Sequence, residues 1–292
     1  MPQKLTFIGL GLMGKPMVQN LLQGDFELTL WNRTKEKCLA FSGQASLARS
    51  AEEAVSNADI IITMLENGPV VDQVLYQSGA IRSIKAGTLV IDMSSISPEM
   101  ARHHSNIVTQ IKSGYLDAPV SGGTTGAQQA RLSIMAGGEK STFEAARQVF
   151  DCLGTPTHIG PAGSGQLAKL ANQAIVGITI GAISEALLLA AQGGADPSAV
   201  REALLGGFAG SKILELHGQR MINRDFEPGA RSSIQLKDLR MILDEARNSG
   251  LTLPLTQRVY DEYLALCASG NGEVDHSGLL LQLEQLNQTR MR

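Results

Sequence analysis

Residues 5–14 read LTFIGLGLMG and join a short apolar run to a Gly-x-Gly-x-x-Gly turn. Residues 5–10 are largely apolar, which predicts a buried strand, and residues 13–22 carry apolar side chains at helical spacing. A glycine triplet between a strand and a helix is typical of dinucleotide-binding units. The stretch therefore predicts the start of a Rossmann-type α/β domain.

Each glycine of the turn has its own physical reason. Gly9 permits the tight turn, Gly11 lets the backbone approach a pyrophosphate, and Gly14 lets the helix pack closely on the sheet. Backbone N–H groups at the start of the helix then bind the anion. The alternative is a turn that only connects the strand to the helix. We predict a cofactor-binding turn made of Gly9, Leu10, Gly11, Leu12, Met13 and Gly14.

The rest of the first 160 residues alternates between strand and helix patterns. Pro98 lies where the first turn of a helix tolerates proline. Such alternation predicts βαβ units and a mostly parallel, doubly wound sheet. The strand patterns are residues 27–31, 58–65, 88–93, 115–120, 132–136 and 157–159, and the helical patterns are residues 97–113 and 141–153.

The pattern changes near Pro161, after which we find almost no strand pattern. We therefore predict two domains, a Rossmann-type cofactor domain over residues 1–161 and an all-helical domain over residues 162–292. The helix at 168–191 is apolar almost all round, which indicates burial inside a domain or between subunits. Its polar residues make a membrane span costly. The predicted helices are residues 164–193, 197–205, 212–222, 236–249, 255–269 and 277–288.

The composition is that of an ordinary globular protein, with 43% hydrophobic and 18% charged residues and a net charge of −3. Neither this charge nor a basic run suggests a nucleic-acid partner. The three cysteines have no metal-ligand spacing, and the five histidines are interpreted as structural, so no metal site is expected. The N-terminus does not look like a signal peptide. We expect a soluble cytoplasmic protein with no membrane partner.

The end of the second strand bears on the choice of cofactor. NAD enzymes commonly carry an acidic residue there, which binds the ribose 2′-hydroxyl. This chain instead has Asn32, Arg33 and Thr34. Arg33 can pair with a 2′-phosphate, and its neighbours can donate hydrogen bonds to it. We predict NADPH in preference to NADH; the alternative is that Arg33 is a solvated residue before a helix.

A lysine inside the long apolar helix is the candidate catalytic group. Burying an ammonium is expensive unless it has partners or a task. Lys169, Asn172 and Gln173 are spaced to share one helical face. In carbonyl reduction a proton must reach the developing alkoxide, and a positioned lysine can supply it. The alternative is a lysine whose stem lies on apolar surface while its head stays in water.

Two loops that follow strands, and one later lysine, are further candidates. Residues 117–123, DAPVSGG, offer the Ser121 hydroxyl and free N–H groups as a nest for a carboxylate, or make an ordinary turn. Ser95 follows another strand and is either a ligand contact or a helix cap. Lys237 either reaches the cofactor or forms a solvated pair with Asp238.

These motifs in this order resemble the β-hydroxyacid dehydrogenase family over nearly the whole chain. The segments that show this resemblance are FIGLGLMGKPM (7–17), ITMLEN (62–67), DMSSISP (92–98), DAPVSGG (117–123), GQLAKLANQ (165–173), LKDL (236–239) and DHS (275–277). Within the family, residues 169–173, 184–190 and 206–222 are most similar to tartronate semialdehyde reductases.

The resemblance implies a role for each matching position. Lys169 would be the catalytic acid, and the substrate carboxylate would lie on Ser121, Gly122 and Gly123. Met64, Leu65, Ser95 and Lys237 would contact the cofactor, and Asn172 and Gln173 the substrate. The family also implies a homodimer or homotetramer formed through long helices.

The chain departs from the family at two places. Many members have Asn four residues after the lysine, where this chain has Gln173. Relatives usually carry an aromatic residue after Pro-Gly, where this chain has Ala230, so the substrate pocket is larger or filled by another side chain.

The expected activity is NADPH-dependent reduction of tartronate semialdehyde (2-hydroxy-3-oxopropionate), or a close aldehyde acid, to the hydroxy acid. The alternatives within enzymes are 3-hydroxyisobutyrate oxidation, glyoxylate or succinic semialdehyde reduction, and imine reduction. A non-catalytic NADPH-binding scaffold is the alternative of another class.

Overall fold

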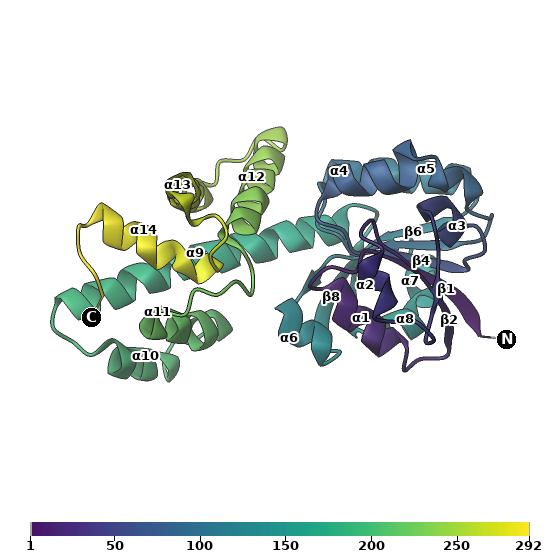
Figure 1. Ribbon diagram of the computed structural model, residues 1–292. Coiled ribbons are helices and arrows are strands. Elements are labelled where there is room, and N and C mark those ends of the chain that lie inside the picture. Colours follow the sequence, from purple (N-terminus) through teal and green to yellow (C-terminus); the bar gives the residue numbers. More distant parts are fainter. Residues whose placement is uncertain (1, 292) are drawn as a thin grey trace. The chain divides into compact units, whose positions relative to one another are not determined.

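The computed structural model describes residues 2–291 and divides into two compact units, Met1–Lys169 and Leu170–Arg292 (Figure 1). The first unit is a mostly parallel sheet with helices, and the second is helical. The predicted fold class is therefore confirmed. The division falls inside helix α9 (Ser164–Gln192), because the first turns of this continuous helix belong to the sheet unit.

The sheet has the strand order β3-β2-β1-β4-β5-β6-β8-β7, with β9 beside β8. Pairing is parallel from β3 through β6, whereas β8 runs antiparallel to both β6 and β7. The chain reverses its direction of progress across the sheet between β1 and β4, which is where ligands bind in doubly wound sheets. The strands are β1 (Gln3–Ile8), β2 (Phe26–Trp31), β3 (Ser46–Leu47), β4 (Ile60–Thr63), β5 (Leu89–Asp92), β6 (Gly114–Asp117), β7 (Val120–Ser121), β8 (Leu132–Gly137) and β9 (Gly154–Gly160).

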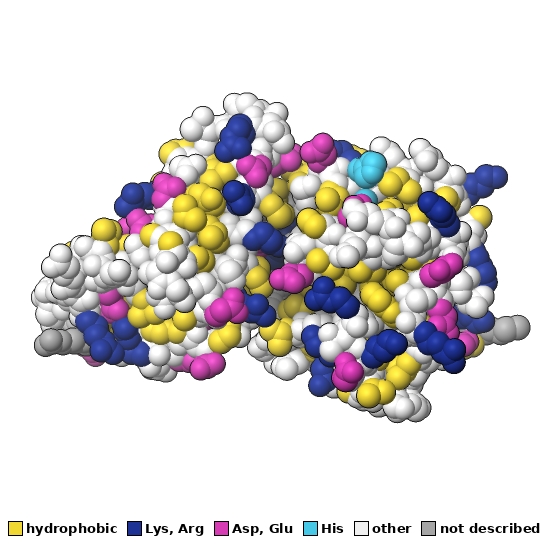
Figure 2. Space-filling model, turned by 45° about the horizontal axis from the view of Figure 1, so that its top comes forward, with side chains coloured by type: hydrophobic (Ala, Val, Ile, Leu, Met, Phe, Trp, Pro, Cys, Tyr) yellow, Lys and Arg dark blue, Asp and Glu magenta, His cyan; other side chains and the backbone are white. Residues whose placement is uncertain are grey.

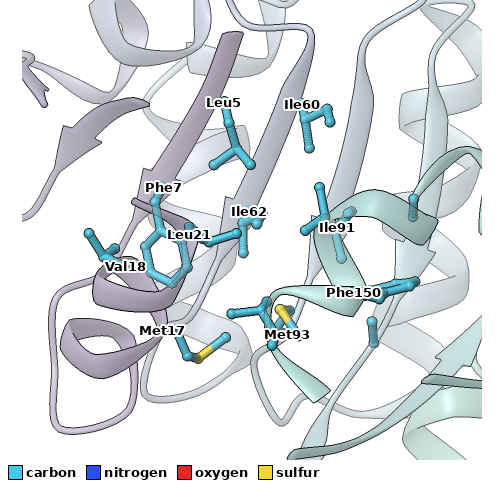
Figure 3. Packing of buried hydrophobic residues seen from close by; sticks show 14 of the residues in the cluster. Leu5, Phe7, Met17, Val18, Leu21, Ile60, Ile62, Ile91, Met93 and Phe150 are labelled. Carbon is cyan, nitrogen blue, oxygen red and sulfur yellow. The ribbon is translucent and has the colours of Figure 1, made fainter. Parts of the chain in front are cut away.

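Alternate residues of the central strands enter two different cores. On β4, Ile60 and Ile62 belong to one cluster and Ile61 to the other, because successive side chains point to opposite faces of a sheet. Helices cover both faces (Figure 1), and Figure 3 shows part of the first core. The helices of this unit are α1 (Gly14–Leu21), α2 (Glu36–Leu39), α3 (Ala51–Val55), α4 (Gly68–Val71), α5 (Pro98–Gln110), α6 (Gly123–Gln128), α7 (Lys140–Ala145) and α8 (Arg147–Asp151).

Some expected elements differ in detail from the structure. The strand expected at 115–120 is two strands, β6 and β7, separated at Pro119, which has no N–H to donate to a ladder. The helix expected at 141–153 is broken at Ala146 into α7 and α8. The short strand expected at 157–159 is the longer β9. The short elements of two to six residues were not predicted from the sequence: β3, α2, α3, α4 and α6.

The second unit packs its helices around a separate apolar core. Among the described residues, α9 is the one helix long and apolar enough to cross a membrane. A single helix of this kind is weak evidence for a membrane span, because core helices of soluble proteins pass the same test. Ile175 is 66% exposed and Leu189 is 76% exposed, so α9 is only partly buried within this chain. Figure 2 shows hydrophobic side chains among the charged ones on the face in view. The other helices are α10 (Pro197–Leu205), α11 (Gln219–Asn223), α12 (Ser232–Asn248), α13 (Pro254–Leu266) and α14 (Leu279–Leu286).

The two-faced core predicts a large loss of stability when one β4 side chain is truncated. Ile61→Ala should lower the free energy of unfolding by about 2–5 kcal/mol, because Ile61 is fully buried and its loss leaves a cavity. Leu39→Ala is the control, since Leu39 is 61% exposed and its change should stay within about 0.5 kcal/mol. Urea denaturation measures both; equal losses would contradict the assignment of the core.

Candidate active site

The glycine turn after β1 has the geometry that a pyrophosphate requires. Gly9 has φ +108°, and a Cβ on it would lie 2.3 Å from the Met64 carbonyl oxygen. A Cβ on Gly14 would lie 1.9 Å from the Gly9 oxygen, so α1 and the turn touch backbone to backbone. A Cβ on Gly11 would meet no described atom within 4 Å. Two glycines therefore serve the fold, and Gly11 leaves open backbone for a ligand.

The start of α1 also fits an anion. Met13 stands at the N-cap, and its side chain makes no capping hydrogen bond to the N–H groups of the first turn. That turn carries no acidic residue. N–H groups at a helix start have no partners within the helix and favour negative charge. Leu12 is 65% exposed, so the outer surface of the turn faces solvent. This cradle fits the phosphates of a nicotinamide dinucleotide.

The end of β2 supports the glycine turn directly. The Asn32 Oδ1 atom accepts a hydrogen bond from Leu10 N at 2.8 Å, and its Nδ2 donates to the Thr34 oxygen at 2.9 Å. Asn32 thus fixes the glycine turn. The sequence had predicted only a hydrogen bond from Asn32 to the phosphate. Arg33 and Thr34 are exposed beside it. Their predicted contact with a 2′-phosphate stays a prediction.

The loops after β4 and β5 lie against each other. Met64 and Leu65 are half-buried, and Leu65 N donates to Ser94 Oγ at 2.9 Å. Ser95 is half-buried and does not cap α5, because Ser97 is the cap and accepts from Met100 N at 3.2 Å. The helix-cap alternative for Ser95 is therefore wrong, and its role as a ligand contact stays a prediction.

Lys169 lies half-buried on the second turn of α9. Its Nζ atom donates a hydrogen bond to the Val120 oxygen at 2.9 Å. Val120 directly precedes Ser121, Gly122 and Gly123, the predicted carboxylate nest. The lysine head therefore lies at the loop that sequence reasoning had connected with the substrate.

The nest itself is a backbone feature. Gly122 and Gly123 have φ values of +132° and +62°, and both are exposed. The region of positive φ favours glycine, and it turns successive N–H groups toward one side. Ser121 ends β7 and is half-buried.

In the second unit, the carboxamides that follow Lys169 along α9 are tied to α12. Asn172 Nδ2 donates to Gln173 Oε1 at 2.9 Å, and Gln173 Nε2 donates to Asp238 Oδ2 at 2.7 Å. Lys237 Nζ forms an ion pair with Asp238 Oδ1 at 3.1 Å, and neither side chain is fully solvated. The alternative for Lys237, a solvated pair with Asp238, is therefore right about the partner and wrong about the solvation, since Asp238 is buried.

Comparisons with known proteins agree with this geometry. Residues 4–163 match the NAD-binding domain family of 6-phosphogluconate dehydrogenase, and residues 163–283 match the family described as the NAD-binding domain of NADP-dependent 3-hydroxyisobutyrate dehydrogenase. The chain is 42% identical to 2-hydroxy-3-oxopropionate reductase of Escherichia coli, covering 96% of this chain and 97% of the relative. It is 35% identical to a probable 3-hydroxyisobutyrate dehydrogenase-like protein of Arabidopsis thaliana, covering 97% of this chain and 86% of the relative.

A solved structure is similar over the same length. The 3-hydroxyisobutyrate dehydrogenase of Mycobacterium tuberculosis, determined with L-serine, superposes with a TM-score of 0.88 at 32% identity. The superposition covers 97% of this chain and 99% of that one. This chain belongs to the β-hydroxyacid dehydrogenase family. It is accordingly an oxidoreductase with a nicotinamide cofactor and a small-molecule substrate.

In this β-hydroxyacid dehydrogenase Ala230 follows Pro228 and Gly229, and Asp275 holds that loop. The Asp275 Oδ2 atom accepts hydrogen bonds from Gly229 N at 3.0 Å and Ala230 N at 3.1 Å. Its Oδ1 accepts from Ser277 N at 3.0 Å and Ser277 Oγ at 2.6 Å. Burial, the largest single influence, acts to raise the pKa of Asp275, but the hydrogen bond from His217, the charge of His276 and then the bonds from Ser277 and Ala230 together hold it well below its usual range.

Two histidines lie beside this carboxylate in the dehydrogenase. His276 Nε2 and His217 Nε2 are 3.2 Å apart, and one ring donates to the other. Burial, and then the charge of His217, lower the pKa of His276 to about 4. Among residues 2–291, His217, Asp275 and His276 are the group close enough to hold a metal ion. Because Asp275 already accepts bonds at both oxygens, we interpret the group as a support for the loop.

Sequence reasoning passed over the buried polar residues that support the site of this dehydrogenase. Asp117 and Gln166 tie the start of α9 to the sheet, and Asp92 accepts from Thr63 Oγ1 at 2.8 Å. The signal was present, because an aspartate at the end of an apolar strand is seldom buried without partners. The partners lie far away in the sequence, so spacing could not identify them.

The glycine geometry predicts that Gly11→Ala affects cofactor binding alone, whereas Gly14→Ala also affects stability. Gly11→Ala should leave the free energy of unfolding within about 0.5 kcal/mol. It should weaken NADP(H) binding about tenfold or more, because the new methyl group lies where the pyrophosphate approaches. Gly14→Ala should destabilise the protein as well, because its Cβ would meet the Gly9 oxygen. Denaturation and cofactor fluorescence titration measure both; unchanged NADP(H) affinity in Gly11→Ala would refute the cofactor site.

Proposed function

We propose that this chain is an NADPH-dependent reductase of small aldehyde acids, with tartronate semialdehyde (2-hydroxy-3-oxopropionate) as the leading substrate. The observation that carries the proposal is the Lys169 ammonium bonded to Val120 O at 2.9 Å, directly before the Ser121–Gly123 nest. The similarity over almost the whole chain to the Escherichia coli reductase supports the choice of substrate.

The chain's own residues would divide the work of the reaction as follows. Ser121 Oγ and the N–H groups of Gly122 and Gly123 bind the substrate carboxylate and so orient the aldehyde. When bound, the nicotinamide supplies the hydride that reaches the aldehyde carbon. Lys169 Nζ holds the aldehyde oxygen and gives it a proton as negative charge develops there. The aldehyde becomes a primary alcohol, and the lysine is left neutral until it regains a proton from water.

The preference for NADPH rests on the end of β2. Arg33 is exposed and cationic, and no acidic residue stands at 32–34 to repel a phosphate. A guanidinium pairs well with phosphate oxygens. Asn172 and Gln173 as substrate contacts, and Met64, Leu65, Ser95 and Lys237 as cofactor contacts, complete the proposed set.

We also propose that the protein acts as a cytoplasmic homo-oligomer. Helix α9 leaves Ile175 and Leu189 exposed, and an apolar helix face of this kind is usually covered. A second copy of the chain is the occupant that the family implies. Light scattering of the purified protein tests this, and a monomer at micromolar concentration would overturn it.

The proton-donor role makes a direct prediction for one variant. Lys169→Ala should lower turnover by about 10²- to 10⁴-fold, the range for acid–base groups, while NADPH still binds. Lys140→Ala is the matched control, because Lys140 is an exposed lysine at the start of α7. Steady-state kinetics and NADPH titration decide; near-normal turnover in Lys169→Ala would refute the role.

Substrate and cofactor are tested together with a panel. Tartronate semialdehyde, glyoxylate and succinic semialdehyde are assayed with NADPH and NADH, and 3-hydroxyisobutyrate with NADP⁺ and NAD⁺. We expect the highest kcat/KM with tartronate semialdehyde and NADPH. Arg33→Ala should lower kcat/KM for NADPH by about 10- to 100-fold, the worth of a charged hydrogen bond, and leave NADH little changed. Equal or better efficiency of the unmodified enzyme with NADH would sink the preference.

A further inference from the structure

Asp117, at the end of β6, is a buried carboxylate that the proposed reaction does not use. Its side chain is 0% exposed. The Oδ1 atom accepts a hydrogen bond from Gly163 N at 2.7 Å, and Oδ2 accepts one from Gln166 N at 2.9 Å. Gly163 directly precedes α9 and Gln166 lies in its first turn, more than forty residues later in the chain.

These bonds cap α9 from outside the helix. The first N–H groups of a helix have no partner within it, and a negative charge there is favourable. Here the cap comes from a strand end, so the first turn of α9 is fixed to the sheet. The fit is close, because a Cβ on Gly137 would lie 2.7 Å from Asp117 Oδ1 and one on Gly165 would lie 2.9 Å from Oδ2.

A second buried side chain ties the same turn to the neighbouring strand end. Gln166 Nε2 donates to the Ser94 oxygen at 2.9 Å, and its Oε1 accepts from Ile96 N at 3.2 Å. The turn that precedes Lys169 is therefore held by the loops after β5 and β6 together.

The segment that holds the turn also holds the head of the lysine. Asp117 binds the start of α9, and Val120, three residues later, accepts the bond from Lys169 Nζ at 2.9 Å. If the turn shifts, the lysine backbone moves while its acceptor stays on the sheet.

We propose that Asp117 is a positioning residue for Lys169: its carboxylate fixes the first turn of α9 and thereby sets the lysine amine against the substrate loop. This inference rests on the proposed role of Lys169 as the proton donor.

The positioning depends on the charge of Asp117. Burial first, and then the negative charge of Asp92 on β5, raise the pKa of Asp117 to about 6 against the lowering effect of the two N–H donors. Tyr115, also on β6, is kept neutral because burial raises its pKa. Above pH 6 the carboxylate accepts both bonds. Below pH 6 one oxygen carries a proton, the cap weakens, and turnover falls.

The first test is the pH profile of kcat in two matched variants. The wild type should show an acid limb near pH 6. Asp117→Asn has almost the same shape but turns an N–H donor toward one of the two amides. Its kcat should fall about 10²-fold, the cost of a small misplacement, with no acid limb, while KM for NADPH changes less than about threefold.

Asp92→Asn is the control, because Asp92 also has its pKa raised to about 6 by burial but does not cap α9. It should keep the acid limb and move it to lower pH, since the charge that raises the pKa of Asp117 is gone. Loss of the limb in Asp92→Asn, or its retention in Asp117→Asn, would overturn the proposal.

The second test needs no substrate. Amide hydrogen exchange of a peptide covering residues 161–168 should be faster in Asp117→Asn, and reductive methylation of Lys169 at pH 8 should be faster as the amine leaves Val120 O. An unchanged Lys169 labelling rate overturns the proposal. Faster exchange and labelling in an enzyme inactive toward every aldehyde acid would support the positioning and refute only the proposed function.

Discussion

The parallel pairing of β1, β2, β4, β5 and β6 is the constraint on which the site depends. Parallel strands end at the same edge of a sheet, so loops that are far apart in the sequence must meet there. Gly9, Asn32, Met64, Ser94 and Asp117 each follow, or end, one of these strands. The glycine turn, its Asn32 support and the buried aspartate come together because of this one geometric rule.

Features carried by local sequence could be predicted. The glycine turn was recognisable because strand, glycines and helix adjoin, and the long helices were recognisable from their apolar spacing. Pro98 and the start of α10 agreed with expectation, since proline at the first turn is a local signal. The lysine on α9 was found because an ammonium in an apolar helix needs an explanation.

Features made by distant contacts could not be predicted. The change from parallel to antiparallel pairing at β8 depends on which strands lie beside it, and the residues of β8 alone do not indicate their neighbours. The bond from Gln166 to Ser94 joins residues 72 positions apart. Asn32 looked like a phosphate ligand by position, but in the structure its amide fixes the backbone of the cofactor turn. Buried polar networks of this kind form between residues that only the fold brings together, so no local motif predicts them.

The break between β6 and β7 has an entropic consequence. Only Ala118 and Pro119 separate Asp117, which caps α9, from β7, which leads to the proposed carboxylate nest. Ala118 N donates to Asp92 O at 2.7 Å and Pro119 O accepts from Met135 N at 3.0 Å, so both ends of this link are bonded to the sheet. A short link with a fixed proline φ has little conformational freedom left to lose. For the proposed carboxylate site, an already ordered loop means that less of the binding free energy is lost in arranging it.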